Sequence, residues 1–156
     1  MTDGALHLDS VAAIIWQAPG PRYLLQHRED RTDIAYANWW SLFGGALEAG
    51  ESAQQALRRE MIEELGLHIS DFSLFISCTF DLRFATLRER KTFFDVEITR
   101  PEAEKLTLKE GQGMAWLRFD EMVARAEQVV PYDLGALALH YARLAPPDTP
   151  IAEFHD

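Results

Sequence analysis

Hydrophobic residues are concentrated along the chain in segments of six to ten positions, a length typical of β-strands. Turn-forming or charged segments separate the runs, which favours strands over helices. Six strands are therefore expected, at residues 10–17, 22–28, 38–43, 71–80, 91–98 and 113–119. The third is expected to end on Gly44-Gly45, and the charged segment 81–90 is expected to form a loop between the fourth and fifth strands.

Three other segments have the pattern of helices. Residues 52–66 repeat apolar positions with helical spacing, and Gly66 lies where a helix C-terminal glycine belongs. Residues 120–128 and 134–143 look helical as well, with Pro131 between them, whereas the proline-rich tail 146–156 is expected to be irregular. Several strands combined with only two or three helices predict an α/β sandwich with a mixed sheet.

The charge of the chain limits its partners. The formal net charge is −10, so we expect no duplex nucleic acid as a partner, although a cation could allow a small phosphorylated ligand to bind. No run approaches the roughly 18 apolar residues of a membrane span, and the N-terminus lacks the layout of a signal peptide. The single cysteine, Cys78, lies in an apolar run and is expected in the core. These features predict a cytoplasmic protein without a membrane partner.

Residues 52–66 place carboxylates where a helix should bury apolar side chains. At about 100° per residue, the apolar stripe contains Ala53, Ala56, Leu57, Met61 and Leu65. Glu60, Glu63 and Glu64 share an arc of about 100° that overlaps this stripe, and their charges repel one another. Arg58 and Arg59 are expected to project away from the three glutamates. Either these glutamates form a solvated acidic face, or a hard divalent cation offsets their repulsion.

The segment before this helix favours the cation. Gly44-Gly45 permits backbone conformations closed to other residues and lets the chain approach a ligand closely. The following loop brings Glu51 to the start of the helix, where a carboxylate suits the positive end of the helix dipole. Together with the three glutamates, these features predict a metal site between the loop and the helix.

The same stretch resembles the signature of the Nudix hydrolases. Read from Gly45, it has the form G-x5-E-x7-R-E-U-x-E-E-x-G-U, in which U is a bulky apolar residue. Every defined position is matched, by Gly45, Glu51, Arg59, Glu60, Met61, Glu63, Glu64, Gly66 and Leu67. The resemblance implies an α/β/α sandwich with a mixed sheet, formed as a single domain over residues 1–156 with its core at about 8–145. It also implies a salt bridge between Glu51 and Arg59 that shapes the turn into the helix.

The resemblance further implies how the site would hold a metal. Gly45 would offer its backbone carbonyl to Mg²⁺ or, in some members of the family, to Mn²⁺. Glu60 and Glu64 would be the main carboxylate ligands, and Glu63 would be a further ligand or would orient the attacking water. Such an ion neutralises a diphosphate and lowers the pKa of a bound water.

Outside the motif, four residues are candidates for substrate chemistry by the same resemblance. Glu110 would supply a further metal ligand or the general base, or else is a surface acid. Arg28 lies where many members place an arginine that contacts phosphate, or else is a surface arginine. Tyr132 and Asp133 lie near the positions with which the branch acting on oxidised guanine nucleotides reads the base.

Two further segments are open between a substrate role and a structural one. The aromatic side chains of Trp39, Trp40 and Phe43 could stack on a base or belong to the core. The basic residues between positions 81 and 91 could cover a phosphate-rich substrate or form a solvated hairpin.

The resemblance implies a metal-dependent pyrophosphohydrolase that cleaves the diphosphate bond of a nucleoside diphosphate linked to another group, such as a sugar. A MutT-like hydrolase of (deoxy)nucleoside triphosphates is the alternative. A regulator that binds a nucleotide without turnover is a third hypothesis, against which the intact glutamates argue. A homodimer, through Trp39-Trp40 or the C-terminal tail, is open.

Overall fold

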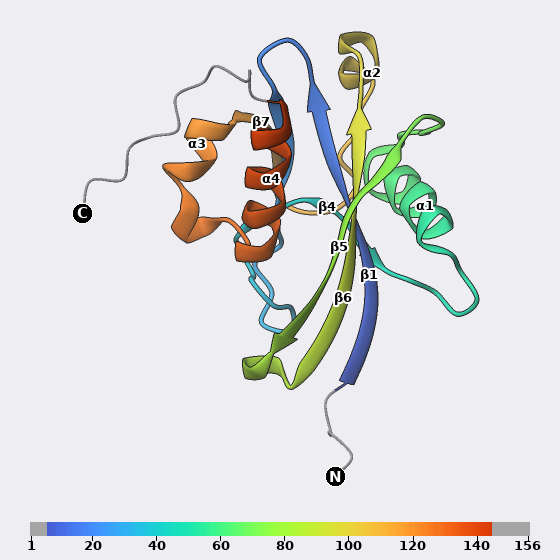
Figure 1. Cartoon of the computed structure of the whole chain (residues 1–156), viewed down its shortest axis with the longest axis vertical. Helices are drawn as coiled ribbons and strands as arrows, with labels where there is room; N and C mark the ends of the chain where they lie inside the picture. Colours follow the sequence, from blue (N-terminus) through green and yellow to red (C-terminus); the bar gives the residue numbers. More distant parts are fainter. Residues whose placement is uncertain (1–5, 145–156) are drawn as a thin grey trace.

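A mixed seven-stranded sheet runs through the computed structural model, which describes residues 6–144 (Figure 1). Strand β1 (Leu6–Gln17) lies in its middle. It pairs in parallel with β6 (Leu87–Glu97) on one side. On the other side it pairs antiparallel with β2 (Arg22–His27) near its end and with β4 (Phe43–Ala46) further back. The central strand therefore contacts elements from widely separated parts of the chain.

Three more strands complete the sheet. β5 (Ser73–Leu82) pairs antiparallel with β6 and ends the strand order on that side. β3 (Trp40–Ser41) and β7 (Gly113–Arg118) both pair with β2. The order β3-β2-β1-β6-β5, with β4 on β1 and β7 on β2, combines parallel and antiparallel pairs. The predicted mixed sheet is confirmed.

Helices cover both faces of the sheet (Figure 1). Helix α1 (Ala53–Leu65) packs on one face, and α3 (Phe119–Val123) and α4 (Pro131–Leu144) lie on the other. The short helix α2 (Arg100–Glu104) follows β6 and was not predicted. The α/β/α sandwich is thus confirmed, and no helix within residues 6–144 is long and apolar enough to cross a membrane.

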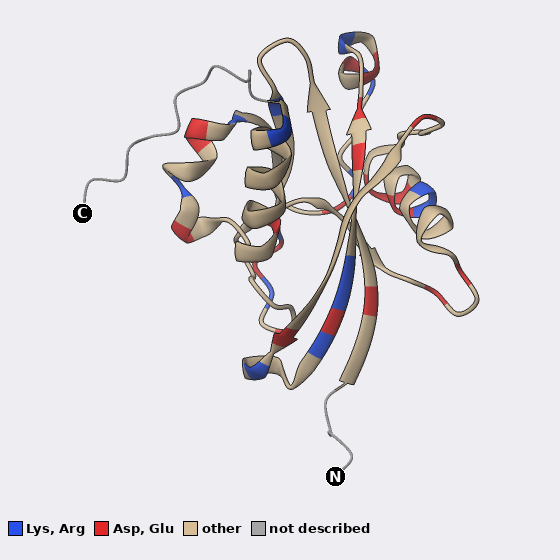
Figure 2. Ribbon diagram, in the orientation of Figure 1, with Lys and Arg blue, Asp and Glu red and all other residues tan. Residues whose placement is uncertain are grey.

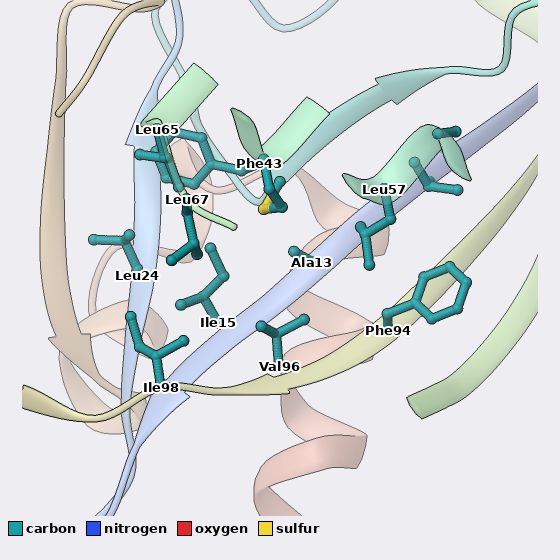
Figure 3. Close-up of a cluster of buried hydrophobic side chains, with 13 residues drawn as sticks. Ala13, Ile15, Leu24, Phe43, Leu57, Leu65, Leu67, Phe94, Val96 and Ile98 are labelled. Carbon is teal, nitrogen blue, oxygen red and sulfur yellow. The ribbon is translucent and has the colours of Figure 1, made fainter. Parts of the chain in front are cut away.

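Strand β1 divides the hydrophobic core into two clusters. Its odd-numbered residues from Val11 to Ile15 face α1, and its even-numbered residues from Ala12 to Trp16 face α4. Figure 3 shows the cluster on the α1 side, where Phe43 and Leu57 pack among residues of β1 and β6. Because β1 is buried on both faces, its sequence is a continuous apolar run, and this is why the strand was predictable.

The prediction that the third strand ends on Gly44-Gly45 was wrong. Both glycines lie inside β4, where Gly44 pairs with Ala12 and Gly45 with Val11. The aromatic run before them is divided between β3 and the start of β4, and Phe43 is fully buried. A pair of glycines usually marks a turn, but here it marks a close approach of backbones inside the sheet.

The segment 81–90 is mostly strand, which corrects the predicted loop. β5 continues to Leu82 and β6 begins at Leu87, so that only a 3₁₀ turn, η1 (Arg83–Ala85), and Thr86 separate them. In Figure 2, blue and red residues alternate along the lower part of β6. Arg88 and Arg90 bind Asp81 and Asp9 of the neighbouring strands. These paired charges on a solvated sheet face concealed the strand from a hydrophobicity pattern.

Near the C-terminal end of the described chain, the helix boundaries also differ. The expected helix at 120–128 consists of α3 followed by a 3₁₀ turn, η2 (Ala126–Gln128). Helix α4 begins at Pro131 rather than at 134, because proline fits the first turn of a helix, whose N–H groups have no intrahelical acceptor. The expectation for the tail at 146–156 lies outside the described residues.

Cys78 is half-buried, so its assignment to the core was wrong. It lies on β5, whose side chains alternate between exposed and half-buried positions. An apolar run on a strand at the edge of a sheet is covered less completely than the same run in the middle.

A buried polar network fastens α4 to the sheet. His140 on α4 is fully buried, with its Nδ1 3.0 Å from the Tyr23 hydroxyl and its Nε2 3.3 Å from Asp95 of β6. Asp95 also accepts hydrogen bonds from Trp16 Nε1, at 2.6 Å, and from Arg143. Although burial acts in the opposite direction, these bonds from His140, Trp16 and Arg143 lower the pKa of Asp95 to about 2.

Replacing Asp95 by asparagine is expected to lower the free energy of unfolding at pH 7 by about 1–2 kcal/mol. Because the pKa of Asp95 falls on folding, its contribution is present above about pH 4 and disappears as the pH falls towards 2. Denaturant titrations at pH 7 and near pH 2.5 should therefore show a difference between D95N and the parent that shrinks in acid. D71N, at an exposed aspartate, is the control; an equal loss at both pH values would contradict the assignment.

Candidate functional site

Helix α1 is fixed at both ends by local hydrogen bonds. At its start, the Ser52 hydroxyl accepts a bond from Gln55 N, and the Gln55 side chain accepts one from Ser52 N, which forms a capping box. At its end, Gly66 takes the left-handed conformation, with φ 64°. The helix predicted over 52–66 is confirmed as Ala53–Leu65 between these two caps.

The face of α1 that meets the sheet carries a carboxylate. Ala56, Leu57, Met61 and Leu65 are buried as the helical spacing predicts, and Glu64 is only 4% exposed among them. Glu64 Oε2 accepts a hydrogen bond of 2.8 Å from Gly44 N, so the helix and β4 are joined at this point.

The second glycine of β4 lies against another glutamate of α1. A Cβ atom on Gly45 would come within 2.5 Å of Glu60 Oε1 and 2.8 Å of its carboxyl carbon. The side chain of Glu60 is 13% exposed, whereas that of Glu63 is 52% exposed. Gly45 thus lets the backbone of β4 approach the Glu60 carboxylate. The approach to a ligand that the sequence predicts for the glycine pair stays a prediction.

The carboxylates of the site influence one another. Burial raises the pKa of Glu64 to about 8, and the negative charges of Glu60 and Glu110 add to the effect, while the bond from Gly44 opposes it. Burial also raises the pKa of Glu60, against the opposing effect of Arg59 and with further repulsion from Glu63 and Glu110. A positive charge beside Glu60 and Glu64 would relieve the cost of ionising both carboxyl groups.

Arg59 connects most of the acidic residues, which corrects the expectation that it projects away. Its guanidinium donates to both oxygens of Glu51 at 2.9 and 3.0 Å, to Glu60 at 2.7 Å and to Glu63 at 3.1 Å. It also donates to the Ala46 carbonyl at 3.0 Å. The salt bridge to Glu51 that the family resemblance implies is present. Arg58 does point away, with its guanidinium over the ring of Phe72.

Glu110 is brought to the site by the loop before β7. Lys109 N donates to the Glu64 carbonyl at 2.9 Å, and Gln26 Nε2 donates to the Glu110 carbonyl at 3.2 Å. Gly111, with φ 88°, turns the chain so closely past His27 that a Cβ would lie 2.8 Å from the His27 carbonyl oxygen. Glu110 itself is exposed, and its charge acts on both Glu60 and Glu64.

The donor set fits a hard divalent cation in chemistry, though the side chains are not gathered into a ligand shell. Carboxylates of Glu60, Glu63, Glu64 and Glu110 and the nearby backbone of Gly45 are oxygen donors of the kind that Mg²⁺ prefers. Within residues 6–144, however, no three His, Cys, Asp or Glu side chains form a group that could hold an ion as they lie. Arg59 donates hydrogen bonds to one oxygen of Glu60 and one of Glu63, where it stands in for a cation.

Asp133 binds the same backbone segment as Glu64, residues 42–44, at its other end. It is fully buried, and its Oδ2 accepts a hydrogen bond of 3.0 Å from Leu42 N. Leu42 is two residues before Gly44, so two acidic side chains bind N–H groups about 7 Å apart along one extended segment. The other oxygen, Oδ1, has no hydrogen bond but lies 3.3 Å from Lys91 Nζ.

Tyr132 and Arg28 lie near Asp133 and Lys91, which together are called the second group. The Lys91 ammonium is 4.7 Å from the centre of the Tyr132 ring. Burial, then the charges of Asp133 and Glu89, raise the pKa of Tyr132, and Arg28 acts in the opposite direction. Arg28 is held by a bond of 3.1 Å from its Nη2 to the Ala35 carbonyl, and its Nε is buried without a partner.

Sequence reasoning did not assign three residues that help to build the site. Gln26 is buried between Glu64 and the loop that holds Glu110. Its position in the sequence pattern of β2 carries no signal of this role. Lys91 was noted only as part of a basic segment. Glu89, 6% exposed, accepts a hydrogen bond from the Ser10 hydroxyl. The buried glutamate on β6 became recognisable only once the strand itself was known.

Comparison with known proteins agrees with this arrangement. A family model described as NUDIX domain matches residues 6–137. The nucleoside triphosphatase NudI of Salmonella arizonae is 30% identical in an alignment of 132 positions that covers 78% of this chain and 86% of that protein. The MutT protein from Methanosarcina mazei Go1 has a TM-score of 0.76 at 20% identity, over 92% of this chain and 99% of its own. The NUDIX domain of Shewanella oneidensis NrtR, complexed with ADP ribose, has a TM-score of 0.71 at 14% identity over 89% of each chain. The chain therefore belongs to the Nudix family and is a hydrolase acting on pyrophosphate bonds.

Proposed function

We propose that the chain is a divalent-metal-dependent pyrophosphohydrolase of small nucleotides, with nucleoside triphosphates as the first substrate class. The observation that carries the proposal is Glu64, a carboxylate 4% exposed beside Glu60 and a glycine backbone, with its pKa raised to about 8. A structural helix has no use for such a group, because an apolar side chain there would pack without this cost.

The buried and the exposed acidic residues would have different roles. Glu60, Glu64 and the Gly45 carbonyl would hold Mg²⁺ or Mn²⁺, which would neutralise the phosphates and acidify a bound water. Glu63 and Glu110 are exposed beside this set and would orient the water and take up its proton. Arg59, bound to Glu51, would keep the helix and the preceding loop in register.

The second group, Asp133 and Lys91, would bind the base of the nucleotide. Asp133 binds the backbone about 7 Å from the N–H group bound by Glu64, along the same extended segment. Asp133 Oδ1 can accept a hydrogen bond, and the Lys91 ammonium beside it can donate one. Buried groups of both kinds recognise a base edge. Tyr132 offers an aromatic ring next to them, and Arg28 a positive charge for a phosphate.

The ranking of substrates depends on the relatives. From the family resemblance, nucleoside diphosphates linked to a sugar or a similar group come first, and nucleoside triphosphates second. The name of the 30% identical relative, a nucleoside triphosphatase, supports the reverse order. A regulator without turnover is less well supported, because the full set of glutamates would not be needed for binding alone.

A panel of nucleotides separates these substrates by their products. With Mg²⁺, a nucleoside triphosphate should give the monophosphate and pyrophosphate, and a nucleotide sugar should give the monophosphate and a sugar phosphate. We expect turnover of at least one triphosphate to exceed that of every nucleotide sugar, measured by chromatography of the products. Removal of the metal with EDTA should abolish it, and added Mg²⁺ should restore it.

Two results would contradict the proposal. Tight binding of a nucleotide without turnover of any would support the regulator. Turnover that survives EDTA would show that the glutamates act without a metal.

A further inference from the structure

An exposed aromatic side chain projects from the turn between β5 and β6. Phe84, in η1, is 69% exposed, among the largest exposures of an apolar side chain within residues 6–144. Its ring contacts Tyr36, with centroids 5.9 Å apart and an angle of 81° between the planes. An edge contact of this kind leaves ring faces uncovered. The turn therefore presents an aromatic face to solvent.

Tyr36 connects this ring to the group proposed to bind the base. Tyr36 lies in the loop after β2, which Figure 1 shows beside the lower tip of the β5–β6 hairpin. It meets Tyr132 edge-on at 5.9 Å and Trp39 at 5.2 Å. Tyr132 in turn lies 5.1 Å from Phe80 of β5. We call these rings, Tyr36, Phe80, Phe84 and Tyr132, the aromatic cluster.

Residues on both sides of the Phe84–Tyr36 contact have strained backbone conformations. Tyr36 has φ 55° and Thr86 has φ 50°, and neither an aromatic nor a β-branched residue favours this left-handed region. Their backbone hydrogen bonds include Trp39 N to the Tyr36 carbonyl at 3.2 Å, Thr86 N to the Arg83 carbonyl at 3.3 Å and Leu6 N to the Thr86 carbonyl at 3.0 Å. Strained residues persist where the surrounding structure or the function requires them.

The aromatic cluster lies beside a pair of opposite charges. Lys91 Nζ is 4.7 Å from the Tyr132 ring centre and 3.3 Å from Asp133 Oδ1, which accepts no hydrogen bond. A flat ligand that makes hydrogen bonds at its edge and stacks on its faces would complement both the charged pair and the rings. A nucleobase has this chemistry, whereas a sugar or a bare phosphate chain does not.

We propose that Phe84, positioned by Tyr36, is a stacking residue for the base of the substrate. The inference rests on the proposed function and deepens it, because it requires a substrate with a planar aromatic base. The β5–β6 hairpin then supplies one face of the base site, and Lys91 of β6 and Asp133 at the start of α4 supply the groups that contact the edge of the base. Loss of the ring should weaken binding of the base and leave the phosphate site unchanged.

The test compares ligands with and without a base. The probes are α,β-methylene analogues of the four deoxynucleoside triphosphates, in which the bond to be cleaved is replaced, and inorganic tripolyphosphate. Affinities with Mg²⁺ are measured by calorimetry. Phe84→Ala should raise the Kd of the best analogue about tenfold, the effect of losing one stacking contact. The Kd of tripolyphosphate should change by less than about twofold, because no base is present.

Matched variants separate stacking from a general disturbance. Phe84→Trp should retain the affinity of the parent, and Leu139→Ala, at a side chain 55% exposed on α4, should bind every probe as the parent does. For any substrate turned over, Phe84→Ala should raise KM and leave kcat nearly unchanged. An equal loss of affinity for tripolyphosphate, no loss for any analogue, or no binding of any analogue to the parent would overturn the proposal.

The same measurements distinguish this inference from the proposed function. If analogue binding depends on Phe84 but no nucleotide is hydrolysed, the stacking role stands and the hydrolase proposal fails. If triphosphates are hydrolysed with the same KM in Phe84→Ala, the hydrolase proposal stands and the stacking role fails.

Discussion

Replacing Glu64 by glutamine should reduce turnover by roughly 100- to 10,000-fold without weakening the fold. The amide oxygen can still accept the hydrogen bond from Gly44 N, so the joint between α1 and β4 is retained. The negative charge is lost, and with it the strongest attraction for a cation in a position only 4% exposed. Initial rates with the best nucleotide and Mg²⁺ measure the first effect.

The stability of the metal-free protein provides the second measurement for this variant. Burial and the charges of Glu60 and Glu110 raise the pKa of Glu64 to about 8, so its carboxylate is costly to hold ionised. Thermal unfolding without metal should therefore show E64Q to be at least as stable as the parent, while the rise in Tm on adding Mg²⁺ should be smaller. Glu127→Gln, at an exposed glutamate of η2, should behave as the parent in both measurements. Retained turnover in E64Q would contradict the assignment of Glu64 to the metal site.

Replacing Gly44 by alanine is expected to have the largest effect on stability. Gly44 has φ 143°, and a Cβ there would lie 2.0 Å from the Val11 carbonyl oxygen and 2.9 Å from the Ala12 Cα. Both atoms belong to the backbone of the central strand and cannot move aside. We expect a loss of about 3 kcal/mol or more, which in a domain of this size lowers Tm by roughly 6–12 °C.

A second glycine distinguishes the clash from the backbone conformation. Gly50 also has a positive φ, 78°, but a Cβ there would have no atom within 4 Å. Gly50→Ala should therefore show only the cost of the left-handed conformation, about 1 kcal/mol. Calorimetric Tm values of the two variants test the comparison. If Gly44→Ala is no less stable than Gly50→Ala, β4 does not pack on β1 as closely as described.

The parts of the site that follow a fixed local spacing could be predicted from the sequence. The C-terminal glycine of α1, Gly66, and the helix face that carries Glu60 and Glu64 lie within one continuous stretch, and the structure confirms both. The capping box at Ser52 was not predicted, and Gly44-Gly45 lies inside β4 rather than at a turn. Arg59 could not be placed in the same way. The helical spacing gives the direction of its Cβ, whereas its long side chain returns to three glutamates.

The contact between groups from distant elements could not be predicted. Lys91 of β6 and Asp133 of α4 meet from positions 42 residues apart, and neither carries a local signal of the other. The strand that holds Lys91 was itself partly missed, because paired charges replace the apolar alternation along β6. A pattern-based prediction therefore finds buried strands and helix faces, but not the partners that only the sheet order brings together.

The parallel pairing of β1 with β6 also has a consequence for how the chain folds. Leu6 pairs with Leu87 and Trp16 with Glu97, so the central strand finds its longest partner about eighty residues later. Pairing at such a separation requires the closure of a long loop, and it slows folding relative to hairpins. During synthesis, the apolar strand β1 must wait until β6 has left the ribosome. In that interval its unpaired edge is open to other chains, which is the period in which this protein is most exposed to aggregation.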